Sequence, residues 1–292
     1  MSAQIAFTKM NGLGNDFVMI EDLSSELDFT PEAVTWFCDR HFGIGADGLI
    51  LIRPATTPSA DYYMHFFNAD GSLAEMCGNG ARCFAKYAVD HGLVADDADS
   101  LVIETLGGLK PVRFTRDEHG LLATATVDMG VPALAPEDIP TTIEGTHVYD
   151  CPIDTPVGEV RITAVNMSNP HVVIWVDDVD EAPVETVGPF LERHEAFPKG
   201  TNVEFAQLVD DRTLRLRVWE RGVGETLACG TGACATLVAA VLSCRTGREA
   251  TIELPGGELF IRWHEDEHVY MTGSAATSFT GAIELPEDEG EG

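Results

Sequence analysis

The stretch Cys77-Gly78-Asn79-Gly80 recurs as Cys229-Gly230-Thr231-Gly232, and the two cysteines are 229 − 77 = 152 residues apart. Their surroundings repeat as well, because Asn68 lies nine residues before the first cysteine and Glu220 nine residues before the second. The repeat predicts two similar halves, each with a Cys-Gly-X-Gly turn that leads into a helix. Two further strings repeat at an offset of 154 residues: 15–20 and 169–174.

Short runs of alternating or β-branched apolar residues dominate the chain, which is typical of β-strands. Helical periodicity is limited to residues 31–40, which begin with Thr30 as N-cap, residues 184–194, and the segment after each Cys-Gly-X-Gly string. The segment from Thr231 to Leu242 is apolar on every side, so that helix must be buried all round. The expected strands are 5–10, 17–22, 49–52, 62–67, 101–105, 121–128, 160–165, 172–176, 214–219, 251–254, 259–263, 269–271 and 279–285.

Many strands and one buried helix per half predict an α+β fold with two pseudo-symmetric domains. Each domain is expected to be a barrel-like antiparallel or mixed sheet around a central helix. The halves are expected to divide near Asp128, because the stretch after it is typical of a connector. The strand at 279–285 is expected to return to the first half. The predicted domains are 1–128 plus 274–292, with Cys77, and 129–273, with Cys229; residues 286–292 predict a solvated tail.

The composition excludes several classes of function. The net charge is −30, with 48 acidic and 18 basic residues, so a nucleic-acid partner is not expected. The acids are scattered along the chain, which favours adaptation to a salty cytoplasm over an ordinary acidic protein. No apolar run of membrane-spanning length and no signal-peptide pattern is present, so a cytoplasmic location is expected. Seven cysteines without a Cys-x-x-Cys pair indicate reduced thiols and no zinc site.

The two repeated cysteines carry the predicted chemistry. A cysteine at a helix N-terminus lies at the positive end of the helix dipole, which stabilises its thiolate. The glycines that follow leave the backbone N–H groups open to a carboxylate, so Gly78/Asn79 and Gly230/Thr231 are expected to bind the carboxylate of an amino acid. One thiolate and one thiol on opposite sides of an α-carbon can remove and return a proton without pyridoxal phosphate or metal. The other five cysteines are interpreted as core residues: Cys38, Cys83, Cys151, Cys234 and Cys244.

With these residues in place, the chain closely resembles the diaminopimelate epimerase family, over nearly its whole length. The resemblance implies cofactor-independent interconversion of LL- and meso-2,6-diaminopimelate in lysine biosynthesis, by a homodimer with two pseudo-symmetric domains. The shared strings are 9–17, 43–48, 67–72, 76–83, 169–171, 220–222, 228–234 and 270–273.

Roles follow from the resemblance, position by position. Cys77 and Cys229 match the two acid/base thiols, and His171 and Glu220 match positions that tune the thiols. An arginine binds a carboxylate through two parallel hydrogen bonds, so Arg221 suits the distal carboxylate, and Glu220 suits an ammonium group. The substrate-contacting positions are Asn15, Asn68, Gly78, Asn79, Asn169, Asn202, Glu220, Arg221, Gly230 and Thr231.

Two positions depart from the family. Gly48 stands where many bacterial members carry Gln, so the polar contact that this side-chain amide would make is in question. Phe279 replaces a tyrosine that helps dimerisation in some members, which weakens the expectation of a dimer.

Two other functions compete with this one. A proline or hydroxyproline racemase of the same fold would have His where Asn79 stands, and would lack the Asn and Arg residues for a second amino-acid head. A thiol redox sensor would explain two activated cysteines but not the glycines beside them.

Overall fold

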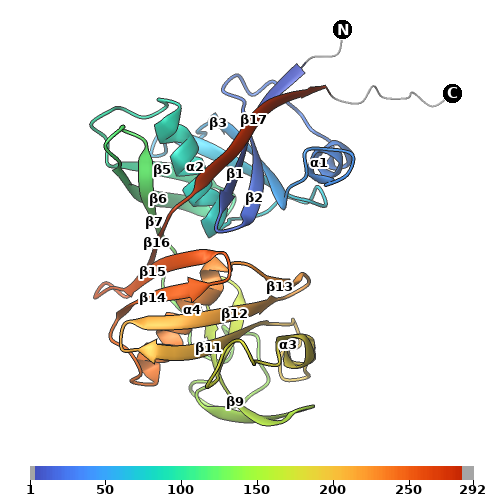
Figure 1. Cartoon of the computed structure of the whole chain (residues 1–292), viewed down its shortest axis with the longest axis vertical. Coiled ribbons are helices and arrows are strands. Elements are labelled where there is room, and N and C mark those ends of the chain that lie inside the picture. Colours follow the sequence, from blue (N-terminus) through green and yellow to red (C-terminus); the bar gives the residue numbers. More distant parts are fainter. Residues whose placement is uncertain (1–3, 285–292) are drawn as a thin grey trace, which may run out of the picture. The chain divides into compact units, whose positions relative to one another are not determined.

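The computed structural model describes residues 4–284, and the chain divides into two compact units (Figure 1). The first unit contains residues 4–127 and 274–284, and the second contains residues 128–273. The predicted tail at 286–292 and the last residue of the strand expected at 279–285 lie outside the described residues. Among residues 4–284, no helix is both long and apolar enough to span a membrane.

The first unit is a mixed sheet in which the strands pair in the order β17-β1-β2-β3-β4-β5-β6-β7. The pairs β2–β3 and β4–β5 are parallel, and the other pairs are antiparallel. The bounds are β1 Gln4–Gly12, β2 Asn15–Glu21, β3 Gly48–Pro54, β4 Tyr62–Asn68, β5 Ser100–Thr105, β6 Gly108–Arg116, β7 Leu122–Asp128 and β17 Ala276–Glu284.

The second unit repeats this pattern in the order β8-β9-β10-β11-β12-β14-β15-β16, with β10–β11 and β12–β14 parallel. The short strand β13 (Gly224–Thr226) pairs with the end of β12. The last strand of the chain, β17, therefore has the place in the first unit that β8 has in the second. The bounds are β8 Cys151–Thr155, β9 Gly158–Asn166, β10 Pro170–Trp175, β11 Asn202–Asp210, β12 Thr213–Glu220, β14 Glu249–Leu254, β15 Gly257–Trp263 and β16 Val269–Gly273.

Each unit has one helix that the strands surround and one that packs on the other face of the sheet. Helix α4 (Gly230–Leu242) contacts strands β9, β10, β11, β14, β15 and β16, as its apolar surface requires. Helix α2 (Gly78–Asp90) has the same place in the first unit and contacts β1, β2 and β6. On the other face, α1 (Pro31–Cys38) packs on β3, and α3 (Val184–Glu192) packs on β11 and β12.

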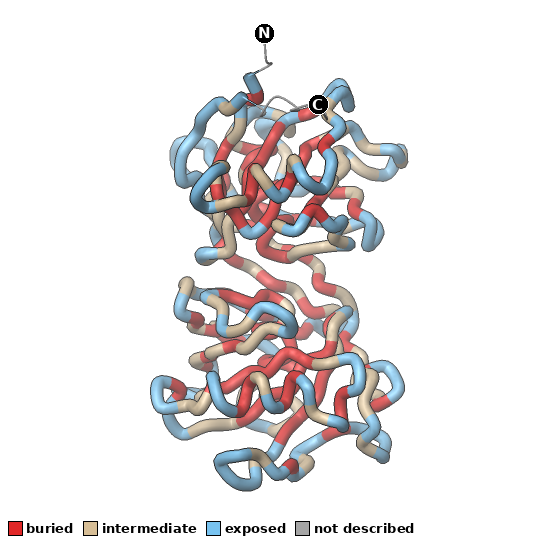
Figure 2. The backbone as a smooth tube through the Cα atoms, turned by 90° about the vertical axis from the view of Figure 1, so that its right-hand side faces the viewer, coloured by how far each residue is buried: buried red, intermediate tan, exposed pale blue. Residues whose placement is uncertain are grey.

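Side-chain alternation along the paired strands fills both layers. In the second unit, Val172 and Ile174 of β10 pack with Val203 and Phe205 of β11 against α3. The residues 154 positions earlier, Val18, Ile20, Leu49 and Leu51, pack against α1 in the first unit. Since successive strand residues point to opposite faces, the residues between them face the central helix. Figure 2 shows buried backbone running through the interior of both units.

The α+β class and the pseudo-symmetric pair of barrel-like sheets around central helices are confirmed. All four predicted helices exist, although α1 and α3 end two residues earlier than expected, at Cys38 and Glu192. Thr30 caps α1, accepting from the backbone N–H of Ala33.

Four strands were not predicted: β6, β8, β11 and β13. Pro111 in β6 and Pro152 in β8 argue against a strand in sequence reasoning. The acidic Glu204 interrupts the apolar pattern of β11.

All seven cysteines have free thiols. Cys38, Cys83 and Cys234 are buried as predicted, whereas Cys151 is half-buried. The prediction for Cys244 was wrong, because it is exposed just beyond the end of α4.

Candidate active site

In the first unit, one edge of the sheet gathers the predicted residues. Strand β2 begins at Asn15, and its parallel neighbour β3 begins at Gly48, which pairs with Phe17. The antiparallel strand β4 ends at Asn68, which pairs with Gly48. These strand ends are therefore adjacent, and α2 begins in the connection that leaves β4.

Cys77 is the N-cap of α2, with extended backbone angles (φ −142°, ψ 120°). Its Sγ accepts from the backbone N–H of Gly80 at 3.4 Å and donates to Asn15 Oδ1 at 3.8 Å. The same Asn15 oxygen accepts from Asn79 Nδ2 at 3.1 Å. The structure thus brings Cys77, Asn15 and Asn79 together around one half-buried thiol.

A network of charged residues holds Asn15 in place. Asn15 Nδ2 donates to Asp47 Oδ2 at 2.8 Å, and Arg40 binds both Asp47 and Asp16. Lys9 Nζ lies 2.7 Å from Asp16. Burial alone would raise the pKa of Asp16, but hydrogen bonds from Arg40 and Lys9 outweigh it and lower the pKa to about 2. Asp16 is therefore ionised at neutral pH.

In the second unit, the equivalent strand ends carry the other predicted residues. Strand β10 begins next to Asn169, β11 begins at Asn202 and β12 ends at Glu220. His171 pairs with Asn202 across β10 and β11, as Phe17 pairs with Gly48 in the first unit. Cys229 is the N-cap of α4.

The environment of Cys229 differs from the expected one. Its Sγ lies 3.5 Å from Thr231 Oγ1, and the residue is only 5% exposed. Burial raises the pKa of the Cys229 thiol well above its usual value, and the carboxylates of Glu220 and Glu204 raise it further. At this cysteine, burial and acidic neighbours outweigh the helix N-terminus, so Cys229 is held as a neutral thiol.

Glu220 is half-buried beside the strand β13. Its Oε1 accepts from Thr226 Oγ1. Burial raises the pKa of the Glu220 carboxyl, although the Thr226 hydrogen bond and nearby His171 act in the opposite direction.

His171 lies between two partners and is fully buried. Its Nδ1 is 2.7 Å from Glu204 Oε1, and its Nε2 is 2.8 Å from Asn169 Oδ1. Sequence reasoning identified His171 and Asn169 but missed Glu204. The available signal was an acidic residue within the apolar run of β11, two positions after Asn202.

The side chain of Asn202 binds the backbone of Arg221. Asn202 Nδ2 donates to the carbonyl of Pro170 at 2.8 Å, and its Oδ1 accepts from the backbone N–H of Arg221 at 2.9 Å. Arg221 Nη1 donates to the carbonyl of Lys199 at 3.0 Å. Asn202 therefore fixes the backbone of Arg221, and direct substrate contact by Asn202 stays a prediction.

Close packing explains the glycine at position 48. A Cβ at Gly48 would lie 2.6 Å from the ring of Phe66 and 2.6 Å from the carbonyl oxygen of Phe67. Any larger side chain therefore requires β4 to move.

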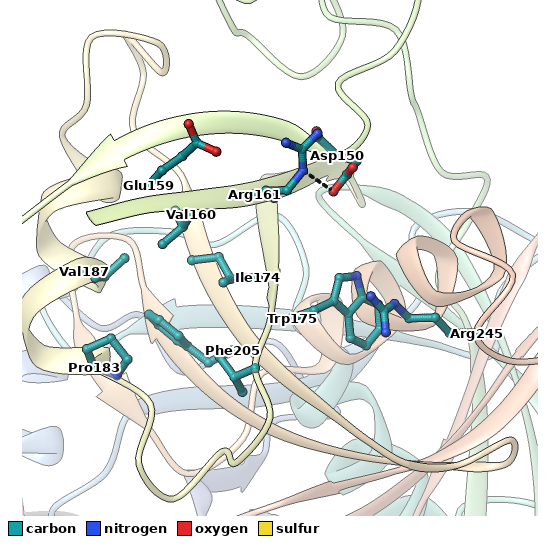
Figure 3. A pocket seen from close by; sticks show the side chains of 11 residues that line it. Asp150, Glu159, Val160, Arg161, Ile174, Trp175, Pro183, Val187, Phe205 and Arg245 are labelled. Carbon is teal, nitrogen blue, oxygen red and sulfur yellow. Dashed lines mark hydrogen bonds and ion pairs between the residues drawn. The ribbon is translucent and has the colours of Figure 1, made fainter. Parts of the chain in front are cut away.

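A cavity of about 370 Å³ lies elsewhere in the second unit, on the α3 side of the sheet (Figure 3). Arg245 stacks on Trp175 at 4.5 Å from the ring centroid, and Arg161 forms an ion pair with Asp150. None of the predicted site residues lines this cavity, so it is separate from the candidate active site.

The chain matches the family model described as diaminopimelate epimerase over residues 7–135 and 163–278. It is 49% identical over 280 residues to the diaminopimelate epimerase of Methanococcus maripaludis, covering 96% of this chain and 99% of that protein. The chain belongs to the diaminopimelate epimerase family. The enzyme of that name from Synechococcus elongatus is 48% identical over 284 residues, covering 96% of this chain and 99% of that protein. Members of the diaminopimelate epimerase family are isomerases, and so is this protein.

Solved structures support the fold. A hydroxyproline epimerase from Agrobacterium vitis, with bound trans-4-hydroxy-L-proline, matches with a TM-score of 0.70 and 16% identity, covering 99% of this chain and 95% of that one. A predicted epimerase from Pseudomonas aeruginosa matches with a TM-score of 0.68 and 14% identity, covering 96% of this chain and 99% of that one. At these identities the likeness of this chain to the two structures shows the fold alone.

Proposed function

We propose that the protein interconverts LL- and meso-2,6-diaminopimelate in lysine biosynthesis, without a cofactor, using Cys77 and Cys229 as the two acid/base groups. One observation carries the proposal. In a chain of this family, each unit starts its central helix with a cysteine at the same place, followed by Gly-X-Gly.

The proposed step moves one proton at a time. The thiolate of one cysteine takes the α-proton, and the thiol of the other gives a proton to the opposite face of the carbon. The backbone N–H groups of Gly78/Asn79 and Gly230/Thr231 hold the α-carboxylate and stabilise charge that moves onto it. The neutral state of Cys229 supports its role as the proton donor when Cys77 is the base.

Diaminopimelate differs from a simple amino acid in having a second carboxylate and a second ammonium group at its distal end. We assign the distal carboxylate to Arg221, and the ammonium group to Glu220. Hydrogen bonds hold the backbone of Arg221 through Asn202 and its side chain through Lys199, which supports this assignment. The polar contacts completing the site are assigned to Asn15, Asn68 and Asn169.

The deciding experiment follows the α-proton. Wild-type protein with LL-diaminopimelate in deuterated water is expected to form the meso isomer and to incorporate deuterium at the epimerised α-carbon. Proline and trans-4-hydroxyproline are the controls, because the alternative is a racemase of the same fold. Racemisation of proline at a rate similar to that of diaminopimelate would transfer the assignment to that alternative.

We also propose that the two units act as catalytic domains with boundaries at 128/129 and 273/274, and that the protein is a homodimer. Strand β17 pairs with β1 on one side and is exposed along almost its whole length. Phe279 in its centre is 49% exposed and packs edge-to-face on Phe7. An exposed strand edge offers unpaired backbone groups to a second copy. Light scattering of wild type and Phe279→Ser tests this, because the substitution is expected to weaken a dimer; a wild-type monomer would end the proposal.

We also propose that the protein works in a cytoplasm rich in salt, and its large excess of acidic residues supports this. At molar salt the Debye length falls to about 3 Å, so repulsion within a chain of net charge −30 is largely screened. The melting temperature is expected to rise between dilute buffer and 2 M KCl. A flat or falling melting temperature would remove this proposal without affecting the enzymatic one.

A further inference from the structure

His171 and Glu204 form a buried polar pair that the first unit lacks. Both side chains are 0% exposed, and they join β10 to β11 through the 2.7 Å contact. The residues 154 positions earlier are Phe17 and Ile50, both buried and apolar. The fold therefore accepts apolar side chains at these two places, and packing alone does not require a histidine and a carboxyl group.

The pair lies directly beneath the start of α4. A Cβ on Gly232 would be 2.9 Å from Glu204 Oε1 and 3.3 Å from Cys229 Sγ. In the first unit, a Cβ on Gly80 would instead meet Ile50 and Phe17. The pair thus occupies the layer between the sheet and the N-terminus of the central helix.

Burial determines how many protons the pair holds. An isolated charge at this depth is strongly disfavoured, so the pair is net neutral, with two protons shared by the imidazole and the carboxyl group. Burial raises the pKa of the Glu204 carboxyl, which agrees with a proton retained by the pair. Among the described residues Glu204 Oε2 has no hydrogen-bond partner, whereas Oε1 lies 2.7 Å from His171 Nδ1, which places the shared proton between Oε1 and Nδ1.

The second proton is then on His171 Nε2. An Nε2–H must donate, and its partner is the amide oxygen of Asn169 at 2.8 Å. The amide group of Asn169 is thereby fixed in one orientation, with its Nδ2 hydrogens pointing away from the imidazole. A carboxylate can accept from this NH₂ group but is repelled by an amide oxygen.

We propose that Glu204 is a positioning residue, which keeps His171 Nε2 a donor so that Asn169 presents its NH₂ group to a substrate carboxylate. This inference rests on the proposed function, in which Asn169 contacts the substrate. The titratable groups that face His171 and Glu204 from the neighbouring elements are the Glu220 carboxyl on β12 and the neutral Cys229 thiol before α4.

Glu204→Gln is the sharpest test, because it keeps the shape of the side chain but no longer restricts His171 to the tautomer with a proton on Nε2. A glutamine amide can donate to Nδ1 or accept from it, so both tautomers of His171, and both orientations of Asn169, become neutral and fully hydrogen-bonded. The KM for diaminopimelate is expected to rise about twofold or more, since about half of the molecules present the wrong group. The kcat is expected to change less, because Glu204 does not touch the reacting atoms.

A spectroscopic measurement separates positioning from a purely structural role. The ¹⁵N shifts of the His171 ring, assigned by their loss in His171→Phe, are expected to show a protonated Nε2 in wild type and a mixture of tautomers in Glu204→Gln. Glu192→Gln is the matched control in the same unit, because Glu192 is also buried and bonded, to Trp219 and Gly222, but does not contact His171. That control is expected to leave the ring shifts unchanged.

The double variant His171→Phe/Glu204→Ile copies the pair of the first unit and guards against misfolding of either single change. It is expected to fold and to raise KM, because Asn169 loses its donor. Unchanged His171 shifts and unchanged KM in Glu204→Gln, with unchanged KM in the folded double variant, would overturn the inference. A wild-type protein that does not epimerise diaminopimelate would instead refute the proposed function. The ring shifts would still show whether Glu204 determines the tautomer of His171.

Discussion

The two cysteines begin equivalent helices in equivalent units, yet their surroundings differ in polarity and burial. Cys77 is half-buried and bonded to neutral amides, and the apolar Phe17 and Ile50 lie next to Gly80, three residues after it. Cys229 is buried, and Glu220 and Glu204 raise its pKa. The same backbone therefore supports one thiol that is half-buried and one that is buried and held protonated. The proposed two-base mechanism requires one thiolate and one thiol at the start of a turnover, and these roles exchange when the reaction runs in reverse.

The largest expected effect tests the proton-transfer role that is proposed for both cysteines. Cys77→Ala and Cys229→Ala are each expected to lower the epimerisation rate by about 10²–10⁴-fold or more, because each removes one proton-transfer group. Cys→Ser at either place is expected to leave at most a trace, since a hydroxyl is a far weaker acid. Cys244→Ala, which alters an exposed cysteine of the second unit, serves as the control and should keep full activity. One fully active single alanine variant at Cys77 or Cys229 would contradict the two-base mechanism.

The next effect tests a feature that only the second unit has. Arg221→Lys keeps the charge but loses the planar guanidinium group, so KM for diaminopimelate is expected to rise by roughly tenfold or more. The residue 152 positions earlier is Ala69, so the first unit offers no equivalent arginine. Steady-state kinetics measure this, with Arg212→Lys in the turn before β12 as the control. An unchanged KM would mean that the distal carboxylate binds elsewhere.

A third effect concerns the difference between the thiols directly. Glu220→Gln removes a negative charge beside Cys229, which makes the thiolate easier to form. The pKa of Cys229 is therefore expected to fall. The rate of alkylation of Cys229 against pH, mapped by mass spectrometry, should shift to lower pH, while the profile of Cys77 stays in place. Equal shifts at both cysteines would indicate a global change in structure.

The smallest effect concerns Gly48, which stands in the first unit where the second unit has Asn202. Gly48→Ala is expected to lower the free energy of unfolding by about 1–3 kcal/mol, because its Cβ overlaps the ring of Phe66 and the backbone of Phe67. Gly247→Ala is the control, because a Cβ there meets nothing within 4 Å. Urea denaturation measures both. A neutral Gly48→Ala would show that β4 shifts readily, and that a family glutamine fits at this position.

The sequence by itself determined the repeat, the four helices and most strands, because these depend on local periodicity and on spacing along the chain. It also identified the two cysteines and the Asn, His, Glu and Arg positions near them, since the strings around them match a known family. The uniform apolar surface of α4 was enough to predict its burial within a sheet.

Only the tertiary structure decided the electrostatics of the two thiols. A helix N-terminus next to each cysteine predicts the same lowered pKa for both, and burial is not visible in a Cys-Gly-X-Gly string. The depth of Cys229 and the approach of Glu220 and Glu204 depend on residues 9 and 25 positions earlier in the chain (229 − 220 = 9, 229 − 204 = 25), on two different strands. Glu204 lay within a strand that the sequence did not predict, because a charged residue in an apolar run argues against burial until its partner, His171, is placed beside it.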